Sequence, residues 1–225
     1  LCAALLGVSL VLKRYSMMGD GLSRGSFGAL SIGIACGIAP LKFAIPVVIV
    51  AAFLLLRLAE NGKMRSDAAI AMVSASSLAI GVIVTSLTTG LSTDIYSYMF
   101  GSILAMSKDD VVVSGLLSVI VTIMFVACYH KIFAATFDEN FSKATGVKVG
   151  MYNTLISIFT AITIVVGIKM MGAMLISSLI VFPSLTSMRI FKSFKSVTIC
   201  SAILSVVNFT IGLICSYGFS IPAGA

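Results

Sequence analysis

The chain has 225 residues, of which 59% are hydrophobic and only 10% charged, and its mean hydropathy is +1.15. A soluble domain has about a quarter of its residues charged, so a chain of this composition could not cover its own surface with polar groups. A soluble enzyme and a disordered segment are therefore excluded, and so is a nucleic-acid-binding domain, although the formal net charge is +7. The composition predicts an all-α integral membrane protein.

Eight apolar segments are candidates for membrane-spanning helices, since about 20 apolar residues cross the hydrocarbon core. We expect them to form one polytopic bundle, a single transmembrane domain over residues 1–225. The first segment is too short to cross, and the last residues carry no charged tail, so we expect both ends to be cuts through a longer protein. In chain order the segments are 1–12, 21–38, 43–59, 68–89, 111–129, 151–168, 170–188 and 196–217.

The basic residues of the loops predict the orientation. Eleven lie in the loops after the first, third, fifth and seventh segments, and three lie in the other loops. Cytoplasmic loops are the ones enriched in Lys and Arg, so the first set is expected inside. That set is Lys13, Arg14, Arg57, Lys63, Arg65, Lys131, Lys143, Lys148, Arg189, Lys192 and Lys195, against Lys42, Lys108 and Lys169 outside.

Two connections are unusual for a simple bundle. Residues 91–110 on the outer side are too apolar for a solvated loop and too short and broken for a span, which favours a re-entrant or interfacial segment. Pro183 interrupts the seventh segment, and 169–172 leaves almost no turn before it. Broken helices of this kind often surround a permeation route. An ordinary kinked span is the alternative, and the residues leave both open.

A short helix is predicted at about 137–146 in the cytoplasmic loop after the fifth segment. It begins with two acids that suit the helix dipole, carries a lysine four residues after the second acid, and has a glycine placed to end it. Its two phenylalanines share a face, so it could dock a partner protein or lie on the lipid surface. The residues concerned are Phe137, Asp138, Glu139, Phe141, Lys143 and Gly146.

Five stretches, in order along the chain, resemble the membrane permease subunits of zinc-, manganese- and iron-type ABC importers, the ABC-3 family. Each is weak alone, but together they cover almost the whole chain. The second is similar to the family's Y-L-F-G-S-I-L, and the third to its S-F-D-E-E-F-A-K-A-x-G-V. The stretches are KRYSMMGDGLS at 13–23, YMFGSILA at 98–105, TFDENFSKATGV at 136–147, VVGIKMMGAMLISSLIVFP at 165–183 and IPAGA at 221–225.

The resemblance implies a permease that works as a homodimer in a bacterial plasma or inner membrane. It implies a cytoplasmic ABC ATPase subunit docked on a coupling helix, here the six residues named for 137–146, and a metal-binding protein docked outside. The chain contains no G-x-x-x-x-G-K-[ST] loop, so ATP hydrolysis is expected from a separate subunit. The permease itself would be no enzyme and bind no cofactor, and its cargo would be zinc or manganese.

One position departs from the family pattern. The family's G-D-x-x-S-H places an acid and an imidazole four residues apart on one helical face, and both groups can ligate a divalent metal. Here the acid is Asp20, the candidate metal ligand, but Arg24 stands at the histidine position. A guanidinium cannot ligate a metal, and at this spacing it can pair with the acid.

Three functions therefore stay open. The first is a permease subunit for a divalent metal, and the second is an ABC permease for a metal chelate or another cargo that Arg24 would favour. The third is a self-contained secondary transporter, but such carriers usually hold several acids within their spans, and here only Asp20, at the edge of the segment 21–38, could lie within one. Other polar residues could face a pathway or join helices: Asn153, Thr163, Ser177, Ser178 and Asn208.

Overall fold

Nine helices make up most of the part of the chain that the computed structural model describes, namely residues 1–13, 15–37, 40–60, 66–88, 99–101, 108–137, 142, 144–146 and 148–219. No strand occurs among these residues, so the all-α prediction is confirmed. The helices are α1 (Cys2–Leu12), α2 (Ser16–Ala35), α3 (Pro40–Glu60), α4 (Ser66–Leu87), α6 (Lys108–Ala127), α7 (Tyr129–Phe137), α9 (Val149–Met171), α10 (Ala173–Ile190) and α11 (Phe194–Phe219).

Five of these helices are long and apolar enough to cross a membrane: α3, α4, α9, α10 and α11. The helices α6 and α7 would add a sixth if they form one span, although they are bent by 68° at the break between them. Each of the eight predicted segments does correspond to a helix. The expected number of eight spans is not confirmed, because α1 has only 11 residues and α2 is too polar to qualify by composition.

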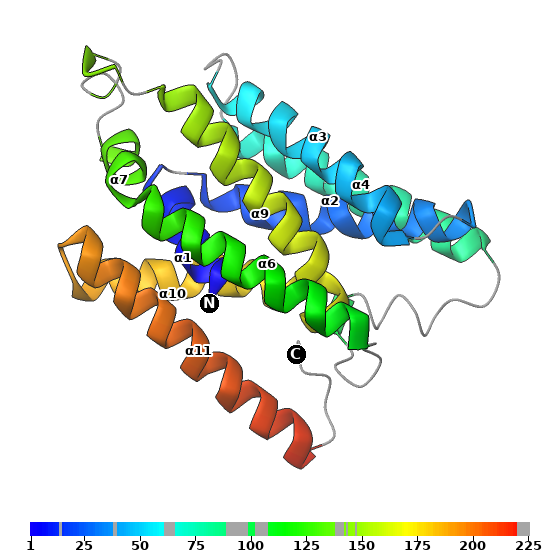
Figure 1. Ribbon diagram of the computed structural model, residues 1–225. Coiled ribbons are helices and arrows are strands. Elements are labelled where there is room, and N and C mark those ends of the chain that lie inside the picture. The colour runs from blue at the N-terminus through cyan, green and yellow to red at the C-terminus, as the bar shows by residue number, and fades with distance from the viewer. Residues whose placement is uncertain are drawn as a thin grey trace.

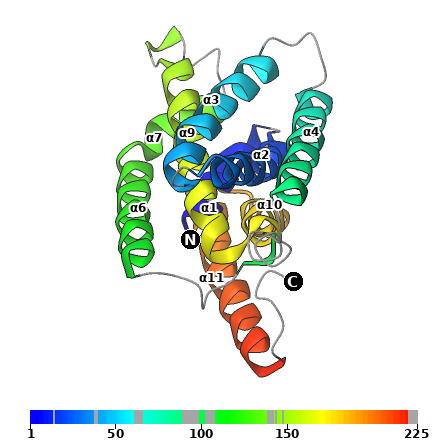
Figure 2. The same cartoon turned by 90° about the vertical axis from the view of Figure 1, so that its right-hand side faces the viewer.

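Helix α2 lies in the middle of the bundle. Figure 2 shows it surrounded by α3, α4, α9 and α10, and all four pack against it. Leu22, Phe27 and Leu30 are among its buried side chains. Small residues let the neighbours approach closely: a Cβ at Gly28 would come within 2.6 Å of the Ser77 carbonyl oxygen on α4. A polar helix is thus packed among more apolar ones, while α3, α9, α6 and α11 run diagonally in similar directions across Figure 1.

Helix α10 continues through Pro183 instead of breaking there. The chain is helical without interruption from Ala173 to Ile190, although proline offers no backbone N–H. The break lies earlier, at Gly172, whose φ of 84° and ψ of 159° end α9 and begin α10 in a single residue. The tight connection expected at 169–172 is therefore present, and of the two alternatives left open at Pro183 the structure shows one continuous helix.

The short helix α7 carries a face of aromatic rings that packs on the start of α11. Phe194 lies with its ring centroid 5.4 Å from that of Tyr129, 5.3 Å from that of Phe133 and 6.0 Å from that of Phe137. Its side chain is only 5% exposed. The cluster of these four rings, hereafter the aromatic cluster, ties the end of the α6–α7 unit to the first turn of α11.

Candidate functional site

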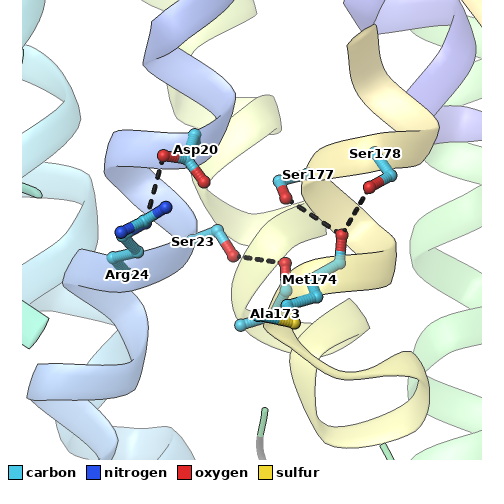
Figure 3. Close-up of polar contacts among 7 residues, drawn as sticks. All are labelled: Asp20, Ser23, Arg24, Ala173, Met174, Ser177 and Ser178. Atoms are coloured by element: carbon cyan, nitrogen blue, oxygen red, sulfur yellow. Dashed lines mark hydrogen bonds and ion pairs between the residues drawn. The ribbon is translucent and has the colours of Figure 1, made fainter. Parts of the chain in front are cut away.

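Asp20 and Arg24 lie one turn apart on α2 and form an ion pair. The Arg24 Nε atom is 3.1 Å from the Asp20 Oδ2 atom, and the two side chains are 44% and 37% exposed. Figure 3 shows the pair on a face of α2 beside the first turns of α10. The contact expected from the four-residue spacing is therefore confirmed.

The local sequence explains how this pair is presented. Helix α2 begins at Ser16, so Asp20 lies about 6 Å further along the axis at 1.5 Å per residue. The residues that precede each member of the pair, Gly19 and Ser23, instead face α10. A Cβ at Gly19 would be 3.2 Å from Ile180 Cγ2, and Ser23 Oγ donates a hydrogen bond to the Ala173 carbonyl oxygen at 2.7 Å.

The surroundings of the pair are weakly polar. Ser177 and Ser178 lie on α10 across from it in Figure 3, but both hydroxyls donate to the Met174 carbonyl oxygen, at 3.0 and 2.9 Å. Asp20 is the one acid whose side chain belongs to the described part of the structure. In that same part no three His, Cys, Asp or Glu side chains come together as a metal cluster. A metal would therefore find one carboxylate here, already paired with a cation.

Other polar residues predicted from the sequence have structural roles or stand apart. Asn153 is buried on α9 and accepts a hydrogen bond from Lys13 Nζ, which joins α9 to the end of α1. Thr163 is buried, and its hydroxyl has no hydrogen-bond partner among the described residues. Asn208 is exposed on α11. None of the three is brought next to Asp20.

Of the predicted coupling segment, the structure describes residues 137, 142 and 144–146. Phe137 is the last residue of α7 and is 58% exposed, with its ring 4.9 Å from that of Phe133. Gly146 has a φ of 82°, as a residue that ends a helix commonly has. The other four residues, Asp138, Glu139, Phe141 and Lys143, lie outside the described residues. So does most of the predicted re-entrant segment 91–110, of which 99–101 and 108–110 are described.

Sequence reasoning missed two residues beside the pair. Ser23 had been noted only within a family-like stretch, and Gly172 only within a short turn. The signal that could have found Ser23 is its position four residues after Gly19, which puts two small residues on one helical face. Such faces let membrane helices approach closely and exchange hydrogen bonds.

Comparison with known proteins agrees with this geometry. Residues 1–225 match the model of the ABC 3 transport family. A protein of Treponema pallidum (strain Nichols) named "Probable metal transport system membrane protein" is 32% identical over 225 residues, covering 100% of this chain and 84% of its own length. The "Manganese import system permease protein ScaB" of Streptococcus gordonii is 27% identical over 99% of this chain and 80% of its own.

Two further relatives extend the comparison. The "High-affinity zinc uptake system membrane protein ZnuB" of Buchnera aphidicola (subsp. Acyrthosiphon pisum, strain APS) is 29% identical over 97% of this chain and 84% of its own length. A solved structure, "PsaBC from Streptococcus pneumoniae in complex with Fab", superposes with a TM-score of 0.86 at 26% identity, covering 99% of this chain and 80% of the other. The whole-chain match and these likenesses show that the chain belongs to the ABC 3 transport family and is a permease.

Proposed function

We propose that the chain forms the translocation pathway of an ATP-binding-cassette importer for a divalent transition metal, zinc or manganese. The observation that carries the proposal is the placement of Asp20, a partly exposed carboxylate on the central polar helix of a bundle whose relatives include proteins named for manganese and zinc uptake. Carboxylate oxygen ligates both metals. An ionisable residue at membrane depth also marks a functional site by default, because it is expensive to keep there.

Two copies of the permease would complete the pathway. The Asp20–Arg24 face of α2 is exposed on a single chain, so a partner copy packed across it would bring a second Asp20 to the same pathway. Two carboxylates could hold a divalent ion transiently where one cannot. We therefore propose a homodimer as the working unit.

The remaining parts of the proposal follow the sequence. All eight predicted segments would cross or enter a bacterial plasma or inner membrane, with 91–110 re-entrant. A separate ABC ATPase subunit would dock on the coupling helix 137–146, and a metal-binding protein would deliver the cargo outside. The exposed half of Phe137 is free for such a docking contact. Membership of this transport family makes a self-contained secondary transporter the weaker alternative.

A second cargo class is favoured by one observation, the ion pair itself. Arg24 neutralises Asp20 at 3.1 Å, so the pair offers little to a bare cation. A metal chelate that carries its own negative charge would instead gain from the guanidinium. The two cargo classes can be distinguished by experiment, because only uptake of a metal chelate requires an added chelator.

The test is radiolabelled metal uptake by the full-length protein with its ATPase and binding protein, in cells that lack their own zinc and manganese importers. Native protein should import zinc or manganese, and Asp20→Asn should reduce the initial rate about tenfold or more, as loss of a metal-site group does. Thr154→Val is the control, because that exposed hydroxyl only bonds the Gly150 carbonyl oxygen of its own helix. If Asp20→Asn leaves the initial rate of metal uptake unchanged, the proposed role of Asp20 in the pathway is contradicted. Uptake that occurs only with an added chelator would favour a metal chelate as the cargo.

A further inference from the structure

The connection between α9 and α10 is held by backbone-to-backbone contact. An ideal Cβ at Gly101 would lie 2.4 Å from the Met171 carbonyl carbon, and one at Gly172 would lie 2.5 Å from the Gly101 nitrogen. Both glycines also have positive φ, 78° and 84°, which other residues rarely adopt. The turn therefore cannot shift without moving the segment 99–101 that rests on it.

This fixed turn reaches α2 through one hydroxyl. Ser23 Oγ donates to the carbonyl oxygen of Ala173, the first residue of α10, at 2.7 Å, and both residues are buried. The other two buried serines on α2 bond differently. Ser26 and Ser31 donate to the carbonyl oxygens of Leu22 and Phe27, four residues back in the same helix.

The hydrogen bond fixes a direction as well as a distance. Successive residues on a helix are rotated by about 100°, so Gly19 and Ser23 share the face turned toward α10, while Asp20 and Arg24 share the neighbouring face. Gly19 packs on Ile180 by van der Waals contact alone. Packing on α3 and α4 limits how far α2 can rotate, and within that range the hydrogen bond favours the orientation that turns Ser23 toward the Ala173 carbonyl oxygen.

We propose that Ser23 is a positioning residue, whose hydrogen bond to the closely packed α9–α10 turn sets the rotation of α2 and so aims the Asp20–Arg24 pair at the pathway. The inference deepens the proposed function and rests on it for the role of Asp20. The rotation of α2 itself is a property of the fold that can be measured without any cargo.

The direct test measures how fast a water-soluble methanethiosulfonate modifies the thiol of Arg24→Cys, in full-length protein whose native cysteines are replaced by serine. Adding Ser23→Ala should change the rate about threefold or more, because α2 can then roll. Ser23→Thr keeps the hydroxyl and should keep the rate within about twofold. Ser26→Ala is the matched control, a buried serine of the same helix whose bond stays within it. Interhelical hydrogen bonds contribute little on average to membrane-protein stability, so all these variants are expected to fold.

The outcomes separate cleanly. Equal rates in the Ser23→Ala and Ser26→Ala backgrounds would overturn the proposal, and so would a changed rate in Ser23→Ala that Ser23→Thr does not restore. The same Ser23 variants, with Arg24 intact, should lose and regain metal uptake in parallel. If the native protein imports no metal, the proposed function is contradicted. The rate of thiol modification would still test the role of Ser23 by itself.

Discussion

The guanidinium of Arg24 determines how strongly the candidate site attracts a cation. At an effective dielectric of 20, a divalent ion about 5 Å from Arg24 is repelled by roughly 7 kcal/mol, and Asp20 at a similar distance returns about the same attraction. The ion pair observed between them therefore presents a nearly neutral surface. Replacing the guanidinium by an imidazole would remove the repulsion and add a ligand.

This arithmetic gives a prediction for Arg24→His. The variant should bind zinc or manganese more tightly than the native permease, by about tenfold or more, and Asp20→Ala in the variant should remove the gain. Calorimetric metal titration of purified protein measures both. Lys42→His serves as the control for net charge, because that exposed lysine lies on another helix. Equal affinities of the native and Arg24→His proteins would show that Arg24 turns away from the cargo.

Contacts between individual residues can be predicted from the sequence where they depend on helical spacing alone. The Asp20–Arg24 contact follows from a four-residue interval on one helix, and it is present. The Ser23 hydrogen bond joins positions 150 apart in the chain. No local pattern specifies which distant carbonyl oxygen lies opposite a buried serine, so that contact required the structure.

At the scale of helices, the aromatic cluster joins α7 to the first residue of α11. The centroids of Tyr129, Phe133 and Phe137 all lie within 6.0 Å of that of Phe194, a range in which ring pairs attract one another beyond simple burial. Phe137, whose side chain is about half exposed, is the first residue of the predicted coupling segment. A displacement of that segment would therefore reach α11 through these rings.

Truncating the buried ring tests this cluster. Phe194→Ala should lower the free energy of unfolding by about 3 kcal/mol, the usual cost of deleting a buried phenylalanine. Phe191→Ala, three residues earlier and exposed, should change it by less than about 0.5 kcal/mol. Unfolding by sodium dodecyl sulfate in mixed micelles provides the comparison. Similar losses in the two variants would mean that the cluster contributes little.

Helix boundaries were predictable to the extent that apolar runs define them. The segments expected at 43–59, 68–89 and 196–217 correspond to α3, α4 and α11 within a few residues. Helix α7 was missed because 129–137 mixes His130, Lys131 and aromatic residues and looks like a charged loop. At Pro183 the sequence leaves a broken and a continuous helix open; α10 is continuous there, and the chain turns at Gly172.

At the scale of the whole molecule, the distribution of basic residues predicts the orientation in the membrane. Helix α11 tests it with a matched pair, because its 26 residues extend about 39 Å, beyond a hydrocarbon core of about 30 Å. In protein lacking native cysteines, Tyr217→Cys should react with an impermeant maleimide on intact cells. Ser193→Cys, flanked by Lys192 and Lys195, should react only after permeabilisation. Labelling in the reverse sense would invert the topology.

The overall architecture was predictable because composition and hydropathy force a helical bundle, and the family match over the whole chain agrees. The number of spans was not predictable, since apolar length cannot tell a crossing helix from one that is packed inside. Helix α2 illustrates this. The sequence places a span at 21–38, yet the helix begins at Ser16 and fails the apolar criterion because its first turns hold Asp20 and Arg24.

That polar central helix constrains how the protein is made. Asp and Arg each cost about 2.5–3.5 kcal/mol at the centre of a lone helix that partitions from the translocon into lipid, so Asp20 and Arg24 disfavour integration of α2 by itself. The helices that pack most extensively on it, α3, α4, α9 and α10, follow it in the chain, and only α1 among its neighbours precedes it. We therefore expect helix α2 to remain beside the translocon until later helices emerge and pack around it. Biogenesis, and the quality control that follows failed insertion, should consequently depend on α3 and α4 as strongly as on α2 itself.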